Sequence, residues 1–303
     1  MVLSLPDDAM PRADSERARG VPRSADFPRS AAVLDRMRSE NFPVAARILP
    51  GGVRQHLHAL YGYFRLVDYA GDEAPGSREA LLNFLEQDLR RAYQGNARIP
   101  IVRQLQFTVR RCGIPQDVLV KLIDANRQDQ QVRRYADFDE LREYCARSAN
   151  PVGEAVLHVF GRAETGLVAL SDRICTALQV LEHCQDIGED YRQADRIYLP
   201  ERDMARFGVT AQDLTAARAS TALRGLVKFE VDRARRMLRD GSVLIGELRG
   251  TARVAVAGYV AGGLATAAAF AAAGHDPLAV DVRPGKGRTF LEWGRLFVSG
   301  GTR

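Results

Sequence analysis

Apolar residues recur at spacings of three and four along almost the whole chain from residue 30 onward, and the stretch from Ala45 to Phe64 shows the pattern well. Such spacing places apolar side chains on one face of an α-helix. The sequence Pro50-Gly51-Gly52 interrupts this stretch and divides it into two helices. The chain shows no sustained two-residue alternation, no hairpin signal and no internal repeat. The sequence therefore predicts an all-α protein.

Capping residues mark several helix ends. Ser77 has the position of an N-cap, and Gly95 ends the apolar face that follows it. Pro115 comes just after a glycine and is typical of the first turn of another helix. Asp137 and Glu140 have the spacing of a capping box. These signals support the helical interpretation through the first half of the chain.

The length of 303 residues allows one large domain or two. The composition is 46% hydrophobic and 27% charged, which is typical of a globular protein with a sizeable core. Residues 1–25 contain three prolines and no continuous apolar run, so we expect a mobile N-terminal arm rather than a signal peptide. We expect residues 26–303 to form a single helical domain.

The formal net charge of +5 suits a nucleic acid, an anionic membrane surface or an anionic substrate, without choosing among them. The arginines are scattered with no long basic run, so no nucleic-acid partner is expected. The four cysteines lack the spacing of a zinc site and are expected to be reduced thiols in a cytoplasm. We therefore expect a cytoplasmic protein, and peripheral contact with the inner face of the membrane stays open.

The segment from Val254 to Gly274 has no charged residue and is long enough to span a membrane. Ten of its residues are alanine and four are glycine. Such a helix gains little from lipid but packs closely against other helices. The composition favours a buried core helix over a transmembrane span.

Two acidic pairs carry the strongest chemical signal. Asp68 and Asp72 stand four residues apart, and Asp186 and Asp190 repeat the spacing. Residues four apart project from the same face of a helix, where like charges repel. Mg²⁺ would offset that repulsion, and it is usually held by a few carboxylates plus substrate phosphates. If the pairs face each other across a cavity, they can hold Mg²⁺ on a diphosphate. Acidic pairs on solvated helix faces are the alternative.

Arg65 precedes Asp68 by three residues, so the two side chains can share a helix face. Arg65 is either one partner of a surface salt bridge or a group that grips phosphate oxygens. A carbocation left behind by a departing diphosphate needs an apolar cavity with aromatic walls. The candidates for that lining, each of which taken singly is more often a core residue, are Tyr61, Tyr63, Phe64, Tyr144 and Phe160.

Three blocks of sequence resemble a known family, the squalene and phytoene synthases. They are YGYFRLVDYAGDE (61–73), RRYADFDELREYCARSANPVG (133–153) and QDIGEDYRQADRIYLP (185–200). The resemblance extends from about residue 40 to about residue 264. It implies an isoprenoid synthase fold of class I, a helical bundle with a central cavity. It also implies an enzyme that acts on isoprenoid diphosphates.

Within the family, four features are similar to the bacterial hopanoid-pathway branch, the hydroxysqualene synthases. They are ENFPVA (40–45), RQDQ (127–130), SANPVG (148–153) and Gln185. This similarity implies conversion of presqualene diphosphate and water to hydroxysqualene and diphosphate, with Mg²⁺ and without NADPH. Condensation of farnesyl diphosphate to presqualene diphosphate or squalene is the alternative within the family. A non-catalytic helical membrane-associated module is the alternative from another class.

The resemblance also implies roles for individual residues. Metal binding falls to the two aspartate pairs, phosphate contact to two arginines, and control of ionisation and proton handling to one tyrosine. The residues so implied are Asp68, Asp72, Asp186 and Asp190 for Mg²⁺; Arg65 and Arg196 for phosphate; Tyr61, Tyr144 and Arg65 for catalysis beside the diphosphate; and Asn41, Gln179 and Phe64 for substrate binding.

A few positions depart from the family pattern. Glu182 stands where the family usually has Asn, and Tyr69 stands where many members have a further Asp. These changes bear on metal binding more than on the fold. Near the C-terminus, Trp293 and Phe297 are spaced i,i+4 and either dock on lipid or, as we favour, pack onto the bundle.

Overall fold

The computed structural model describes residues 22–28 and 49–301, and all the regular structure in these ranges is helical. The all-α prediction is therefore confirmed. The elements in chain order are η1 (Ser24–Asp26), α3 (Gly51–Asp68), η3 (Tyr69–Glu73), α4 (Arg78–Gln94), α5 (Pro100–Cys112), α6 (Gln116–Gln128), α7 (Phe138–Ser148), α8 (Asn150–Val159), α9 (Thr165–Gln185), α10 (Ile187–Ala194), α11 (Glu201–Phe207), η4 (Ala211–Thr215), α12 (Thr221–Gly241), α13 (Leu244–Glu247), α14 (Gly250–Ala272) and α15 (Lys286–Ser299).

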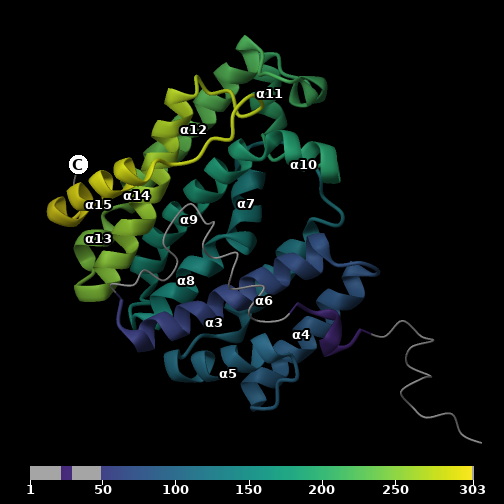
Figure 1. The fold of residues 1–303 in the computed structure, drawn as a ribbon, viewed down its shortest axis with the longest axis vertical. Helices are drawn as coiled ribbons and strands as arrows, with labels where there is room; N and C mark the ends of the chain where they lie inside the picture. The colour runs from purple at the N-terminus through teal and green to yellow at the C-terminus, as the bar shows by residue number, and fades with distance from the viewer. Residues whose placement is uncertain (1–21, 29–48, 302–303) are drawn as a thin grey trace, which may run out of the picture.

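The helices divide into two ends with a middle layer between them. Helices α3 to α6 form one end, α10 to α15 form the other, and α7, α8 and α9 lie between (Figure 1). Each end has its own buried apolar core, one drawn mainly from residues 60–123 and the other from residues 125–282. Helix α9 packs against α7, α8, α12 and α14. The second aspartate motif follows directly from this central helix.

The predicted helix ends are found where the capping residues stand. The hydroxyl of Ser77 accepts a hydrogen bond from the backbone N–H of Ala80 at 3.2 Å. Gly95 has φ of 90°, a left-handed conformation that glycine adopts without strain. Asp137 accepts from the backbone N–H groups of Asp139 and Glu140. Local sequence chemistry thus sets the boundaries of α4 and α7.

The N-terminal arm predicted for residues 1–25 lies mostly outside the described residues. Its last residues enter η1, after which Phe27 is buried and stacks on Phe84 with ring centroids 6.0 Å apart. Asn41, predicted to bind substrate, also lies outside the described residues.

Helix α14 contains the uncharged segment whose role the sequence left open. Among the helices of residues 22–28 and 49–301, it alone is long and apolar enough to cross a membrane. Of the 18-residue stretch that meets this test, 67% is buried inside the protein. It packs against α9, α12, α13 and α15. Gly263 allows this close approach, because a Cβ there would lie 2.7 Å from Cδ2 of Leu178. In this structure α14 is a core helix.

Gly241, the last residue of α12, is a second point of close approach. A Cβ there would lie 2.7 Å from Cγ1 of Ile174 and 3.0 Å from the carbonyl oxygen of Leu170, both on α9. Gly241→Ala should therefore lower the free energy of unfolding by about 1–3 kcal/mol. Chemical denaturation measures this value.

Gly166 on α9 provides the matched control, because a Cβ there would meet nothing within 4 Å. Gly166→Ala should be neutral or stabilising by up to about 1 kcal/mol, since alanine loses less backbone freedom in a helix. Equal effects of the two substitutions would contradict the close packing of α9 on α12.

Candidate active site

One cavity of about 430 Å³ lies between the two ends of the molecule, with walls from α3, α6, α7, α8, α9 and α14. Every described residue to which the family resemblance assigns a role lines it. These residues are Asp68, Asp72, Asp186, Asp190, Arg65, Arg196, Tyr61, Tyr144, Gln179 and Phe64. Residues 118 positions apart in the chain are thus brought to one site, although their chemical roles stay predictions.

Two aromatic residues expected in the lining are elsewhere. Tyr63 is fully buried, and its hydroxyl donates to the carbonyl oxygen of Leu119 at 3.1 Å. Tyr61 and Tyr63 are two positions apart on α3, so they point to nearly opposite sides of the helix and only one can face the cavity. Phe160 follows α8 and packs against the apolar core instead. The prediction was wrong for Tyr63 and Phe160.

The first aspartate motif includes a change of helix type. Asp68 is the last residue of α3, and the chain continues as a π-helical turn in which the N–H of Ala74 donates to the carbonyl of Tyr69 at 2.8 Å. Such single turns are often found at functional sites. Gly71 lies so close to α6 that a Cβ would be 1.9 Å from Oδ1 of Asn126. This contact fixes the turn that carries Asp72.

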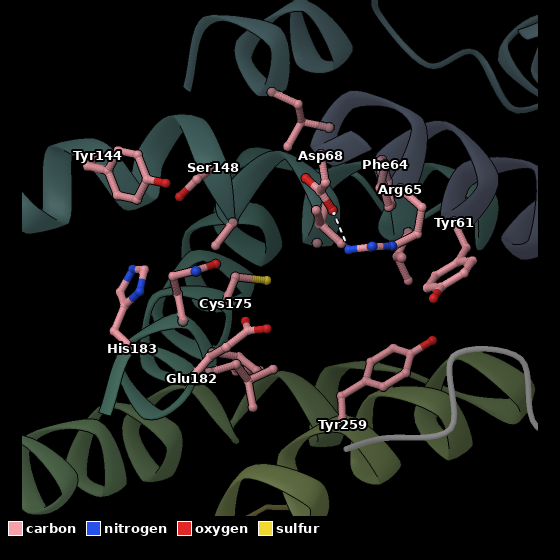
Figure 2. A pocket seen from close by; sticks show the side chains of 18 of the residues that line it. Tyr61, Phe64, Arg65, Asp68, Tyr144, Ser148, Cys175, Glu182, His183 and Tyr259 are labelled. Carbon is pink, nitrogen blue, oxygen red and sulfur yellow. Dashed lines mark hydrogen bonds and ion pairs between the residues drawn. The ribbon is translucent and has the colours of Figure 1, made fainter. Parts of the chain in front are cut away.

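Two arginines neutralise the first motif. Arg65 donates to Asp68 at 3.2 Å and to Glu73 at 2.9 Å. Arg196, which is nearly buried, donates to Asp72 at 2.8 Å across 124 positions of sequence. The salt bridge anticipated for Arg65 is therefore present, and it lies at the cavity wall (Figure 2). Both guanidinium groups are placed where an anionic substrate would compete with the carboxylates for them.

The second motif differs from its expected geometry. We expected Asp186 and Asp190 on one continuous helix, but α9 ends at Gln185 and α10 begins at Ile187. Asp186 lies at the junction with ψ of 8°. The N–H of Asp190 still donates to the carbonyl of Asp186 at 2.8 Å, so both side chains reach the same cavity.

The electrostatics of the second motif favour the binding of a cation. Burial and the charge of Glu189 raise the pKa of Asp186 to about 6. Burial and the charge of Asp186 raise the pKa of Asp190 to about 7, while Arg196 opposes the shift. The ionised carboxylates are therefore costly to keep together without an added positive charge.

Asp129 is a site residue that motif reasoning missed. Its carboxylate, at the C-terminal end of α6, accepts hydrogen bonds from the hydroxyls of Tyr144 at 2.7 Å and Tyr198 at 3.0 Å. Burial raises the pKa of Asp129 to about 6, and the charge of Arg196 acts in the opposite direction. It stands within the RQDQ segment, and its position before a Gln-Gln-Val turn gave no indication of a buried partner. Asp129 fixes the orientation of two tyrosines in the cavity wall.

The residues of the cavity suit a magnesium ion whose remaining ligands would come from a bound diphosphate and water. No cluster of three His, Cys, Asp or Glu residues suited to metal binding occurs within the described parts of the chain. Mg²⁺ commonly takes only one or two carboxylates, with phosphate oxygens and waters as its other ligands. Asp186 and Asp190 on one side and Asp68 and Asp72 on the other provide oxygen ligands of this kind.

A helical cavity with two aspartate pairs and two arginines beside an apolar wall is suited to a molecule that joins a diphosphate to a long apolar chain. The family profile described as "Squalene/phytoene synthase" matches residues 36–293. The chain belongs to this family, whose enzymes act on isoprenoid diphosphates and typically depend on Mg²⁺. Family membership rules out the alternative of a non-catalytic module.

Individual relatives extend this comparison. The chain is 33% identical over 269 residues to the hydroxysqualene synthase of Zymomonas mobilis, covering 88% of this chain and 89% of the relative. A solved squalene synthase from Alicyclobacillus acidocaldarius is 37% identical with a TM-score of 0.74, covering 83% of this chain and 98% of that one. A solved dehydrosqualene synthase is 22% identical with a TM-score of 0.79, and the match covers 89% of this chain and 95% of that one. This similarity shows that the two chains share a fold. The predicted class I isoprenoid synthase fold is confirmed.

Replacing Asp190 should stabilise the protein when no metal is added. Because the pKa of Asp190 is raised, the folded state keeps a proton that the unfolded chain releases, and stability falls as the pH rises toward about 7. Asp190→Asn removes this cost, so its Tm should exceed that of the parent at about pH 8 with EDTA present. The difference should shrink as the pH is lowered toward about 4.

Asp195 is the matched control because the hydrogen bond from Arg134 lowers its pKa, and its shift therefore has the opposite sign. Asp195→Asn should lower Tm or leave it unchanged at the same pH. Thermal unfolding followed by circular dichroism measures both variants. A Tm for Asp190→Asn at or below that of the parent at about pH 8 would contradict the electrostatic account of the second motif.

Proposed function

We propose that this protein converts presqualene diphosphate and water to hydroxysqualene and diphosphate with Mg²⁺ and without NADPH. The observation that carries the proposal is that both aspartate pairs and a long apolar wall line the same cavity. The chain is 33% identical, over most of both chains, to a protein named hydroxysqualene synthase. This identity supports the proposed reaction over the other reactions of the family.

The charged end of the cavity would bind the diphosphate. Bound Mg²⁺ would neutralise charge on the departing diphosphate. Arg65 and Arg196 would exchange their present carboxylate partners for phosphate oxygens, a geometry that the planar guanidinium suits. The aspartates they release would then be available to hold the metal. This exchange of partners would couple the binding of substrate to the binding of metal.

The apolar part of the cavity would hold the hydrocarbon chains. It is formed by aliphatic side chains from six helices, which would exclude water from a reactive carbocation. The aromatic rings of Tyr61 and Phe64 lie in the same wall and offer their faces to positive charge. The aliphatic residues of this wall are Leu57, Leu60, Leu122, Val152, Val156, Leu157, Ile174, Leu178, Leu244 and Val256.

Formation of squalene from farnesyl diphosphate is the second candidate. The solved structure at 37% identity is described as a squalene synthase, which supports an activity of that kind. Both candidates use the same aspartates, and they differ in the starting diphosphate and in how the final carbocation is quenched.

The candidates separate in a product assay. Purified protein with Mg²⁺ and without NADPH is incubated with presqualene diphosphate or with farnesyl diphosphate, and the lipids are identified by mass spectrometry. We expect hydroxysqualene from presqualene diphosphate. Presqualene diphosphate formed from farnesyl diphosphate would favour the second candidate, and no diphosphate release from either substrate would overturn both.

Asp186→Ala supplies the negative control of this assay. It should abolish turnover while the helical circular dichroism signal is retained, because the side chain lies at a helix junction and not in the core. The matched variant Asp240→Ala removes an exposed carboxylate on α12 and should keep its activity. Normal turnover in Asp186→Ala would remove the second motif from the mechanism.

We further propose that the protein is cytoplasmic and binds peripherally to the inner face of the membrane through α15. Trp293 fixes this helix to α14 by donating to the carbonyl of Val254 at 3.0 Å, as the packing interpretation expected. Large apolar side chains of α15 nevertheless face outward, and Phe290 and Val298 are 70% and 84% exposed. Such a patch at the surface of an enzyme with lipid substrates suits a bilayer.

Positive charge beside this patch favours anionic lipid as the partner. A groove of about 1000 Å³ lies between α12, α14 and α15. Its arginines are Arg235, Arg239, Arg288 and Arg295, against the single carboxylate of Glu292. Basic side chains next to exposed apolar ones are the combination that holds a helix at an anionic membrane surface.

Vesicle flotation tests the α15 surface. Binding to vesicles containing phosphatidylglycerol should fall about tenfold or more when Phe290 and Val298 are both replaced by Ser. Each substitution removes apolar surface that the parent would bury in the bilayer. Val280, which is also exposed but lies outside α15, is the control, and Val280→Ser should bind like the parent. Equal binding of all three proteins, or dimerisation through α15 in place of vesicle binding, would contradict the proposal.

A further inference from the structure

Two polar atoms in the cavity wall are buried without a hydrogen-bond partner in the described part of the chain. They are Nε2 of His183 and Oγ of Ser148, and both residues line the cavity. Buried polar groups almost always have a partner, and where protein provides none an ordered water commonly does. The hydroxyl of Tyr135 is also unpartnered, but Tyr135 does not line the cavity.

His183 and Ser148 occupy one part of the wall. Ser148 is four residues after Tyr144 on α7, so the two share a helix face. The ring centroid of His183 lies 6.1 Å from that of Tyr144. Figure 2 shows His183, Tyr144 and Ser148 together on the side opposite Arg65 and Asp68.

The neighbouring hydroxyls are already engaged. Tyr144 and Tyr198 both donate to Asp129, so neither needs a water as acceptor. The ring of His183 stacks on Tyr198 with centroids 3.8 Å apart and planes within 9°, which fixes its orientation. His183 and Ser148 are thus buried polar groups of this wall that can still bind a small ligand.

The position along α9 places His183 near the expected carbocation. His183 precedes Asp186 by three residues, which is a rise of about 4.5 Å along the helix. The carbon that loses diphosphate must lie beside the diphosphate and its metal ligands. The cation would therefore form close to the last turn of α9, the turn that carries the imidazole.

The state of the imidazole suits it to hold a water. Complete burial lowers the pKa of His183 to about 3, so the ring is neutral near pH 7 and one nitrogen keeps a lone pair that accepts a hydrogen bond. A water that donates to this nitrogen directs an oxygen lone pair elsewhere. Ser148 can accept or donate a second hydrogen bond to the same water.

We propose that His183 and Ser148 form the site of the water molecule that captures the carbocation. This inference rests on the proposed function, because it concerns the origin of the hydroxyl group. The water oxygen forms a C–O bond with the cationic carbon through its lone pair. One O–H bond of the water then breaks, and its proton passes to His183 and from there to the departing diphosphate. No redox partner is required, since hydroxysqualene and hydrogen diphosphate account for all atoms of the substrate and the water.

Substitution at His183 tests this site through the products. His183→Phe keeps an aromatic ring to stack on Tyr198 but cannot accept a hydrogen bond. With presqualene diphosphate as substrate, the yield of alcohol per diphosphate released should fall about a hundredfold, which is the effect of losing a positioned base. Hydrocarbon formed by proton loss from the carbocation should replace the alcohol. His183→Gln, which retains an acceptor, should restore part of the alcohol. His158→Phe, on α8 and outside the cavity lining, is the control and should keep the product ratio of the parent.

Ser148→Ala provides a second variant that changes little volume and stays informative if His183→Phe does not fold. It should also lower the yield of alcohol per diphosphate released. Parent protein that yields no alcohol from presqualene diphosphate would overturn the proposed function itself. Parent protein that yields alcohol, together with unchanged product ratios in both His183→Phe and Ser148→Ala, would overturn the water site alone and leave His183 as a packing residue.

Discussion

Repulsion among carboxylates gathered at one end of an apolar cavity is the constraint on which the site depends. Burial and the charge of Glu189 raise the pKa of Asp186, and burial and the charges of Asp186 and Asp72 raise the pKa of Asp190. Arg196 opposes that repulsion and at the same time holds Asp72 at 2.8 Å. The folded chain therefore brings together carboxylates whose ionised forms are stabilised by cations between them. Arginine supplies this charge in the absence of ligand, and a metal with its diphosphate can take over.

The same arginine connects the charged end to the tyrosine wall. Burial raises the pKa of Asp129 and the charge of Arg196 opposes that rise, while the Asp129 carboxylate accepts hydrogen bonds from the hydroxyls of Tyr144 and Tyr198. Tyr198 in turn stacks on His183. Movement of Arg196 onto a phosphate would thus change the field at Asp129 without any contact between Asp129 and substrate. The diphosphate site and the wall that faces the carbocation form one electrostatic unit.

Much of this architecture could be predicted from the sequence because its causes are local. Helix periodicity, the cap at Ser77 and the four-residue spacing of the aspartates each depend on neighbours a few positions away. Residues whose roles depend on long-range partners were missed. Asp129 is one, because its tyrosine partners stand 15 and 69 positions further on. The break at Asp186 was also missed, since no proline or glycine precedes it.

The π-helical turn from Tyr69 to Glu73 has a consequence for how such a site can arise. A π-turn adds one residue to a helical turn, so the side chains after it are out of phase with those before it. Asp68 belongs to the register of α3, whereas Asp72 belongs to a register that faces Arg196. A single inserted residue in an ordinary amphipathic helix is therefore enough to turn a carboxylate from one neighbour toward another. The spacing of four residues in the sequence is common on solvated helices, and the hydrogen-bond pattern of this turn is what sets the present pair apart from them.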